Sequence, residues 1–116
     1  MKNINERLES ILEKIGYIEQ IIQKASSITN ALSDKATSCP AILMHLIAIA
    51  EQIAKISAED NTKASEIFGD EAIKGFCDIR NFIAHDYDGV NMAVIEWLLR
   101  HGLYELKTRV VQNIKS

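Results

Sequence analysis

The stretch "AILMHLIAIAEQIAKIS", residues 41–57, is apolar almost all the way round a helix until Glu51. Such a helix is either the centre of a helical bundle or a surface shared between two subunits, and the sequence leaves both alternatives open. Ser38 is the expected N-terminal cap of this helix, and Pro40 lies in the first turn, where a missing amide costs little. His45 lies within the apolar run, and we expect it to be buried and satisfied by a neighbour rather than functional.

A long amphipathic helix is predicted before this stretch, over residues 3–26. Asn3 followed by Glu6 resembles a capping box at its start. Apolar side chains then recur at steps of four and three, at Ile4, Leu8, Ile11, Leu12, Ile15, Ile18, Ile22 and Ala25. This stripe indicates one side of a bundle core.

After the central stretch, residues 58–70 ("AEDNTKASEIFGD") predict a loop because Asp, Asn, Ser and Gly are frequent. Asp70 is the expected cap of a third helix over residues 71–85. The last helical region has Gly102 in its middle, which predicts a kink or a short break. No part of the sequence alternates with period two, so we predict an all-α fold, an antiparallel bundle of four main helices with the last helix kinked near Gly102.

The composition predicts one globular domain over residues 1–116. Apolar residues make up 47% of the chain and charged residues 25%, which is typical of folded rather than disordered proteins. The formal net charge of −3 excludes a broadly basic nucleic-acid coat, so an RNA contact would need a local basic pocket. The two cysteines, Cys39 and Cys77, do not make a disulfide framework.

Targeting and metal-binding patterns are absent from the sequence. The start, "MKNINERLES", does not resemble a secretion signal, and we expect no run of membrane-spanning length. The sequence therefore predicts a soluble cytoplasmic protein without a membrane partner. The histidines and cysteines lack zinc-ligand spacing, so we expect no metal and no cofactor. Trp97 lies among apolar residues of the last helix, which favours core or dimer packing over stacking on a nucleobase.

The chemistry is concentrated in "RNFIAHDY", residues 80–87. Arg80 and His85 are five positions apart, about 7.5 Å along an ideal helix, and do not share a face. If the helix ends near His85, the negative end of its dipole favours a protonated imidazole. The segment then offers a phosphate-binding cation, a proton-transfer group, and a phenol, Tyr87, that can orient either. Asn81 and Asp86 are supporting candidates.

Such a set of groups suits metal-independent cleavage of RNA, in which a ribose 2′-hydroxyl attacks the neighbouring phosphate. One histidine is short for two proton roles, and a two-fold dimer would supply two. A structural alternative remains open. Arg80 could pair with Asp78 or Asp86, His85 could cap helix carbonyls, and Tyr87 could pack its ring, with the same sequence as the result.

The order Arg-x4-His-x-Tyr at the end of a third helix is typical of HEPN domains, and "IRNFIAHDY" resembles their bacterial HepT-like form. Residues 41–57 are similar to the second helix of that family, although the usual Ile-Gly-Glu-Ala reads Ile-Ala-Glu-Gln here. Residues 86–99, "DYDGVNMAVIEWLL", resemble the family's His-x-Tyr, Gly-Val and Trp sequence. The resemblance covers residues 6–109. Many relatives have Pro-Trp at the positions of Ala72 and Ile73, and Leu-Pro at those of Leu103 and Tyr104.

The resemblance implies a homodimeric toxin of a HepT/MntA-type toxin–antitoxin pair, with a minimal nucleotidyltransferase as the antitoxin. It assigns ribonuclease activity to Arg80 and His85. It also implies that the antitoxin silences the toxin by modifying Tyr87 with AMP. Two alternatives stay open: a non-catalytic nucleotide- or partner-binding subunit of a nucleotidyltransferase complex, and a bare helical dimerisation module.

Overall fold

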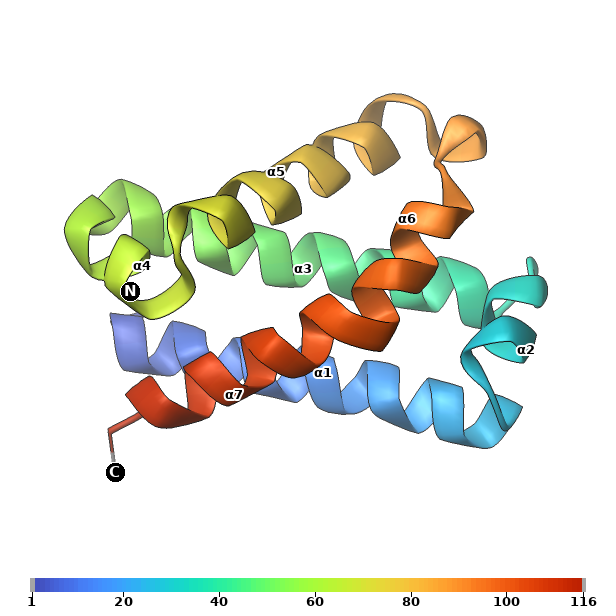
Figure 1. The fold of residues 1–116 in the computed structure, drawn as a ribbon, viewed down its shortest axis with the longest axis horizontal. Helices are drawn as coiled ribbons and strands as arrows, with labels where there is room; N and C mark the ends of the chain where they lie inside the picture. Colours follow the sequence, from blue (N-terminus) through green and yellow to red (C-terminus); the bar gives the residue numbers. More distant parts are fainter. Residues whose placement is uncertain (1, 116) are drawn as a thin grey trace.

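The computed structural model describes residues 2–115, and this part of the chain is helical without any β-strand (Figure 1). The four main helical segments run antiparallel to their neighbours in the bundle, which confirms the predicted fold. The elements are α1 (Ile4–Ala25), α2 (Ile28–Ser33), α3 (Ser38–Glu59), α4 (Asn61–Phe68), α5 (Asp70–His85), η1 (Tyr87–Gly89), α6 (Met92–Trp97), η2 (Leu98–Gly102) and α7 (Leu103–Asn113).

Helix α1 begins and ends within one residue of the predicted boundaries and has the predicted capping box. The Asn3 side chain accepts a hydrogen bond from the Glu6 amide at 2.8 Å, and the Glu6 carboxylate accepts one from the Asn3 amide at 3.2 Å. The helix ends at Ser26, whose φ of 75° is left-handed, so the backbone turns away from the helical path. The apolar stripe of α1 faces α3 and α7.

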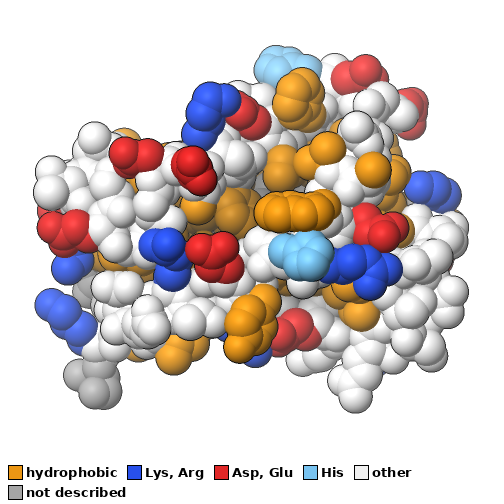
Figure 2. Space-filling view, viewed as in Figure 1, with side chains coloured by type: hydrophobic (Ala, Val, Ile, Leu, Met, Phe, Trp, Pro, Cys, Tyr) orange, Lys and Arg blue, Asp and Glu red, His pale blue; other side chains and the backbone are white. Residues whose placement is uncertain are grey.

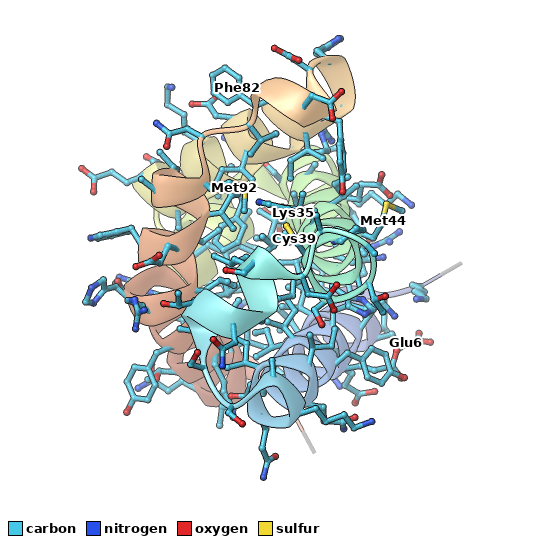
Figure 3. The ribbon with its side chains drawn as sticks, turned by 90° about the vertical axis from the view of Figure 1, so that its right-hand side faces the viewer. Glu6, Lys35, Cys39, Met44, Phe82 and Met92 are labelled. Atoms are coloured by element: carbon cyan, nitrogen blue, oxygen red, sulfur yellow. The ribbon has the colours of Figure 1, made fainter. Side chains whose placement is uncertain are left out.

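Helix α3 lies at the centre of the bundle and contacts α1, α2, α4 and α5. Its buried residues are Cys39, Ile42, Leu43, Leu46, Ile49, Ala50, Ile53 and Ile56. By length and hydropathy alone α3 could cross a membrane, so the expectation that no run reaches that length is wrong. In this fold 39% of the apolar stretch of α3 is buried inside the bundle, and Met44 is 61% exposed and points outward (Figure 3).

The predicted cap of α3 is also wrong. Ser38 is already the first helical residue, and Thr37 stands in the cap position without a side-chain hydrogen bond. The carboxylate of Asp34 takes over the capping, because it accepts hydrogen bonds from the amides of Thr37 and Ser38, each at 3.2 Å. The cap therefore comes from the preceding turn.

The segment predicted as a loop, residues 58–70, contains a short helix, α4. Asp60 caps it by accepting a hydrogen bond from the Lys63 amide at 3.0 Å, and Ala64, Ile67 and Phe68 are buried. Gly69, with φ of 82°, then stands before α5. Asp70 is thus the first residue of α5 and not its cap.

The last main segment runs through α6, η2 and α7 as one continuous helical path, with backbone angles in the right-handed helical region at both junctions. Its middle part, η2, is π-helical, so the helix is irregular near Gly102 but does not have the short break that was one of the two predicted forms. A β-carbon at Gly102 would come within 2.6 Å of the Leu98 Cδ1 atom. The glycine therefore gives the Leu98 side chain room at the π-helical turn.

His45 packs against α1 but is only half-buried, so the full burial expected of it is wrong. Its ring centroid lies 5.3 Å from that of Tyr17, and the Lys14 Nζ atom lies 5.5 Å from the Tyr17 ring. Burial lowers the pKa of His45, and the positive charge of Lys14 lowers it further. Because its folded-state pKa lies below the ordinary value, the unfolded chain binds more protons at this site than the folded chain does.

We expect the contribution of His45 to stability to be complete above the ordinary histidine pKa of about 6.5 and to decline as pH falls below it. Urea unfolding at a series of pH values should show this decline in the native protein and a flatter profile in His45→Gln. His101→Gln, at an exposed position, is the matched control and should keep the native profile. Identical profiles for the native chain and His45→Gln would contradict the assignment.

Candidate active site at the end of α5

Helix α5 ends at His85, the boundary predicted from the sequence. Asp86 leaves the helical region, with φ of −151° and ψ of 75°. Its amide still donates to the Phe82 carbonyl at 2.9 Å, and its carboxylate accepts a hydrogen bond from the Gly89 amide at 3.1 Å. Asp86 therefore closes α5 and opens the turn η1, which carries Tyr87.

The guanidinium of Arg80 is free of carboxylate partners in the described part of the chain. Its Nη2 atom donates to the Asn81 side-chain oxygen at 3.3 Å. Asp78 instead pairs with Lys74 at 2.7 Å, and Asp86 is used as the cap of η1. The alternative in which an ion pair occupies Arg80 is therefore not what the structure shows.

His85 and Tyr87 are both open to solvent. His85 is an exposed residue in the last turn of α5, and Tyr87 is 46% exposed. The Tyr87 ring is therefore not buried in the core. This differs from the structural alternative, in which the ring packs against other side chains. Asn81 and Asp86 are also exposed, so the predicted site residues share one accessible end of α5.

Within one chain these groups do not converge on an enclosed pocket. Five positions on an α-helix correspond to about 140° around the axis, so Arg80 and His85 point in different directions. A hollow of 1060 Å³ between α5 and α6–η2–α7 is lined by Phe82 and Asp86, whereas Arg80, His85 and Tyr87 are not among its lining residues. One copy thus presents the reactive groups on an open surface.

The hollow was not predicted from the sequence, and Trp97 lies at its surface. The indole is 62% exposed and lines the hollow, so it does not pack in the core, and packing in a dimer, the other arrangement that the sequence favoured, stays a prediction. Val94, on the same face, is 47% exposed, and the His101 ring lies 5.3 Å from the indole. The signal in the sequence was the spacing of Val94, Trp97, His101 and Tyr104, a second apolar and aromatic stripe on a helix whose other side fills the core.

In the described residues, His, Cys, Asp and Glu side chains do not gather in threes or more where a metal ion could bind. Cys39 is buried and Cys77 is half-buried, both as free thiols. Arg80 thus remains the one motif side chain with a permanent positive charge.

Asp86→Ala should loosen the turn that places Tyr87, because the Gly89 amide loses its acceptor. We expect the free energy of unfolding to fall by about 1 kcal/mol, the usual effect of losing a cap. Asp88→Ala is the matched control, since the Asp88 carboxylate makes no hydrogen bond within residues 2–115. Chemical denaturation of both variants measures the difference, and equal losses would contradict the capping role.

A known protein family matches most of this chain. Residues 11–112 match the HepT-like family, described as "Ribonuclease HepT-like". The matched region includes the whole of α5 and η1 and agrees with the resemblance seen over residues 6–109. No curated protein and no solved structure matches the chain. The family match spans most of the sequence, and the chain therefore belongs to the HepT-like ribonuclease family.

Proposed function

We propose that this chain is the toxin of a toxin–antitoxin pair, a metal-independent endoribonuclease that acts on RNA in the cytoplasm as a homodimer. The observation that carries the proposal is that the Arg80 side chain is not used in an ion pair within the described residues. Its guanidinium has no carboxylate partner in the described part of the chain, and it lies five positions before an exposed histidine, His85, on the same helix. A guanidinium of this kind is well suited to bind a phosphate.

The reaction follows from the chemistry of these groups. An imidazole of His85 takes the proton from a ribose 2′-hydroxyl, whose oxygen attacks the adjacent phosphorus. Arg80 stabilises the negative charge that builds up on the phosphate oxygens. A protonated second imidazole gives its proton to the departing 5′-oxygen, so that the products are a 2′,3′-cyclic phosphate and a 5′-hydroxyl.

A second copy of the chain supplies what one copy lacks. Each chain offers one histidine in the motif, and Arg80 diverges from His85 around the helix axis. Two α5 ends brought together by a two-fold axis would place two imidazoles and two guanidiniums around one phosphate. The open position of the motif on the single chain is consistent with this arrangement.

The AMP-modified residue in this proposal is Tyr87. Its half-exposed phenol can attack the α-phosphorus of ATP within a minimal nucleotidyltransferase antitoxin, and pyrophosphate leaves. The adenylyl group would fill the space beside His85 and add negative charge where the RNA phosphate binds. Modification would thus silence the toxin by repulsion and by steric exclusion.

His85→Ala should stop RNA cleavage without unfolding the protein, because the side chain is exposed. We expect the cleavage rate of purified protein on cellular RNA to fall by about 100-fold or more, the usual effect of removing a general acid–base group. His101→Ala, at another exposed histidine, should cleave like the native chain. If the native protein and His85→Ala are equally inactive while both bind a nucleotidyltransferase, the non-catalytic partner-binding alternative takes its place.

Tyr87→Phe should make the toxin insensitive to the antitoxin. The variant lacks the phenol oxygen that accepts AMP, so co-expressed nucleotidyltransferase should no longer protect growing cells from it. Intact-protein mass spectrometry measures the added AMP on the native chain and its absence on the variant. Tyr104→Phe, at a 76% exposed tyrosine, is the matched control. Modification that persists in Tyr87→Phe would refute the assignment.

A further inference from the structure

The hollow between α5 and α6–η2–α7 has an apolar floor. Figure 2 shows hydrophobic side chains within this depression and at its edges. Phe82 is 68% exposed and Trp97 is 62% exposed, and both line the hollow together with the half-exposed Val94. Large apolar side chains around a hollow of 1060 Å³ are typical of a surface that binds a partner.

The rim of the same hollow is acidic. The carboxylates that line it are Asp70, Glu71, Asp78, Asp86 and Glu105, against a single cation, Arg109. Arg109 is itself paired with Glu105 at 3.4 Å. Glu71 and Asp86 have no basic side chain within 4.0 Å in the described part of the chain. The rim therefore carries a net negative charge beside an apolar floor.

The negative charge of the rim indicates which kind of molecule the groove can bind. An RNA backbone would meet like charges along the rim, and a second copy seated here would bring two acidic rims together. A helix with one apolar side flanked by lysine or arginine complements both the floor and the rim. The groove is also elongated, bounded along its length by α5 on one side and by α6, η2 and α7 on the other.

The position of the groove points to a role for such a helix. One end of the groove is formed by Asp86, Gly89 and Val90, the residues that surround Tyr87 in the turn η1. We propose that the groove docks a basic amphipathic helix of the protein that modifies Tyr87. This inference rests on the proposed modification of Tyr87 and adds the surface and the chemistry by which the modifying protein is recognised.

Gly75 provides a variant that blocks the groove without endangering the fold. It lines the groove within α5, and a β-carbon built on it meets no atom within 4 Å. Gly75→Leu should therefore fill the groove while it improves the helical propensity of α5. Gly16 in α1 is equally free of contacts and lies outside the groove, so Gly16→Leu is the matched control.

The first measurement uses a synthetic helical peptide of leucine and lysine, with a leucine–glutamate peptide of the same pattern as its counterpart. Trp97 is the single tryptophan of the chain and reports binding through its fluorescence. We expect the lysine peptide to shift the emission to shorter wavelength, with an affinity that falls as salt rises. Gly75→Leu should weaken binding by about tenfold or more, whereas Gly16→Leu should bind like the native chain.

Three results of this titration would overturn the proposal. They are equal binding of both peptides, equal affinity of Gly75→Leu and the native chain, and a Trp97 emission that shifts with protein concentration alone. The last result would assign the groove to a second copy of the chain.

The second measurement is AMP transfer to the native chain and to both variants by a minimal nucleotidyltransferase of the class proposed as the antitoxin. We expect Gly75→Leu to raise the KM for the chain by about tenfold or more and to leave RNA cleavage unchanged. Equal KM values for Gly75→Leu and the native chain would overturn the docking site. A complete lack of transfer to the native chain would instead refute the proposed modification of Tyr87, and the peptide titration would still decide whether the groove binds a basic helix.

Discussion

Burial of the apolar surface of α3 is the constraint on which the rest of the fold depends. Its buried positions extend beyond a single stripe, so α1 and α5 can both pack on it at once. Helix α5 contributes only Phe76 and Ile83 as buried residues, and its packing partners are α3 and α4. Helix α5 packs on α3 and not on α6–η2–α7. The groove between α5 and α6–η2–α7 therefore remains open.

The same packing explains why the reactive residues are accessible. Ile83 anchors the last turn of α5 at 3% exposure, while its neighbours in the motif project outward. Asp86 then ends the helix and uses its carboxylate to fix the next turn. Gly89 is needed there, because a β-carbon at this position would collide with the Asp86 side chain. A buried anchor and a capped turn thus hold His85 and Tyr87 in place without covering them.

The sequence predicts this fold well wherever a pattern is regular. The stripe of α1, the end of α5 at His85 and the irregularity near Gly102 follow from periodicity, chemistry and glycine propensity. Helix α4 was missed because its buried residues, Ala64, Ile67 and Phe68, are embedded in a polar segment. The cap of α3 comes from Asp34, four residues upstream of the residue that local rules suggested. The groove could not be foreseen, because it depends on how two helices diverge in space.

Electrostatics can keep the two sides of α5 functionally separate. The net charge of the chain is −3, so a phosphate must be attracted by a local cation rather than by the whole protein. At physiological salt, charges are screened over about 8 Å, which is less than the diameter of about 10–12 Å of a helix with its side chains. Asp70 and Glu71 of the groove lie ten and nine positions before Arg80, about 13–15 Å along the helix, so they weaken phosphate binding at Arg80 only slightly, while the groove carboxylates together repel RNA from the groove itself. One helix can thus present a cation to RNA on one side and an acidic, apolar surface to a protein on the other.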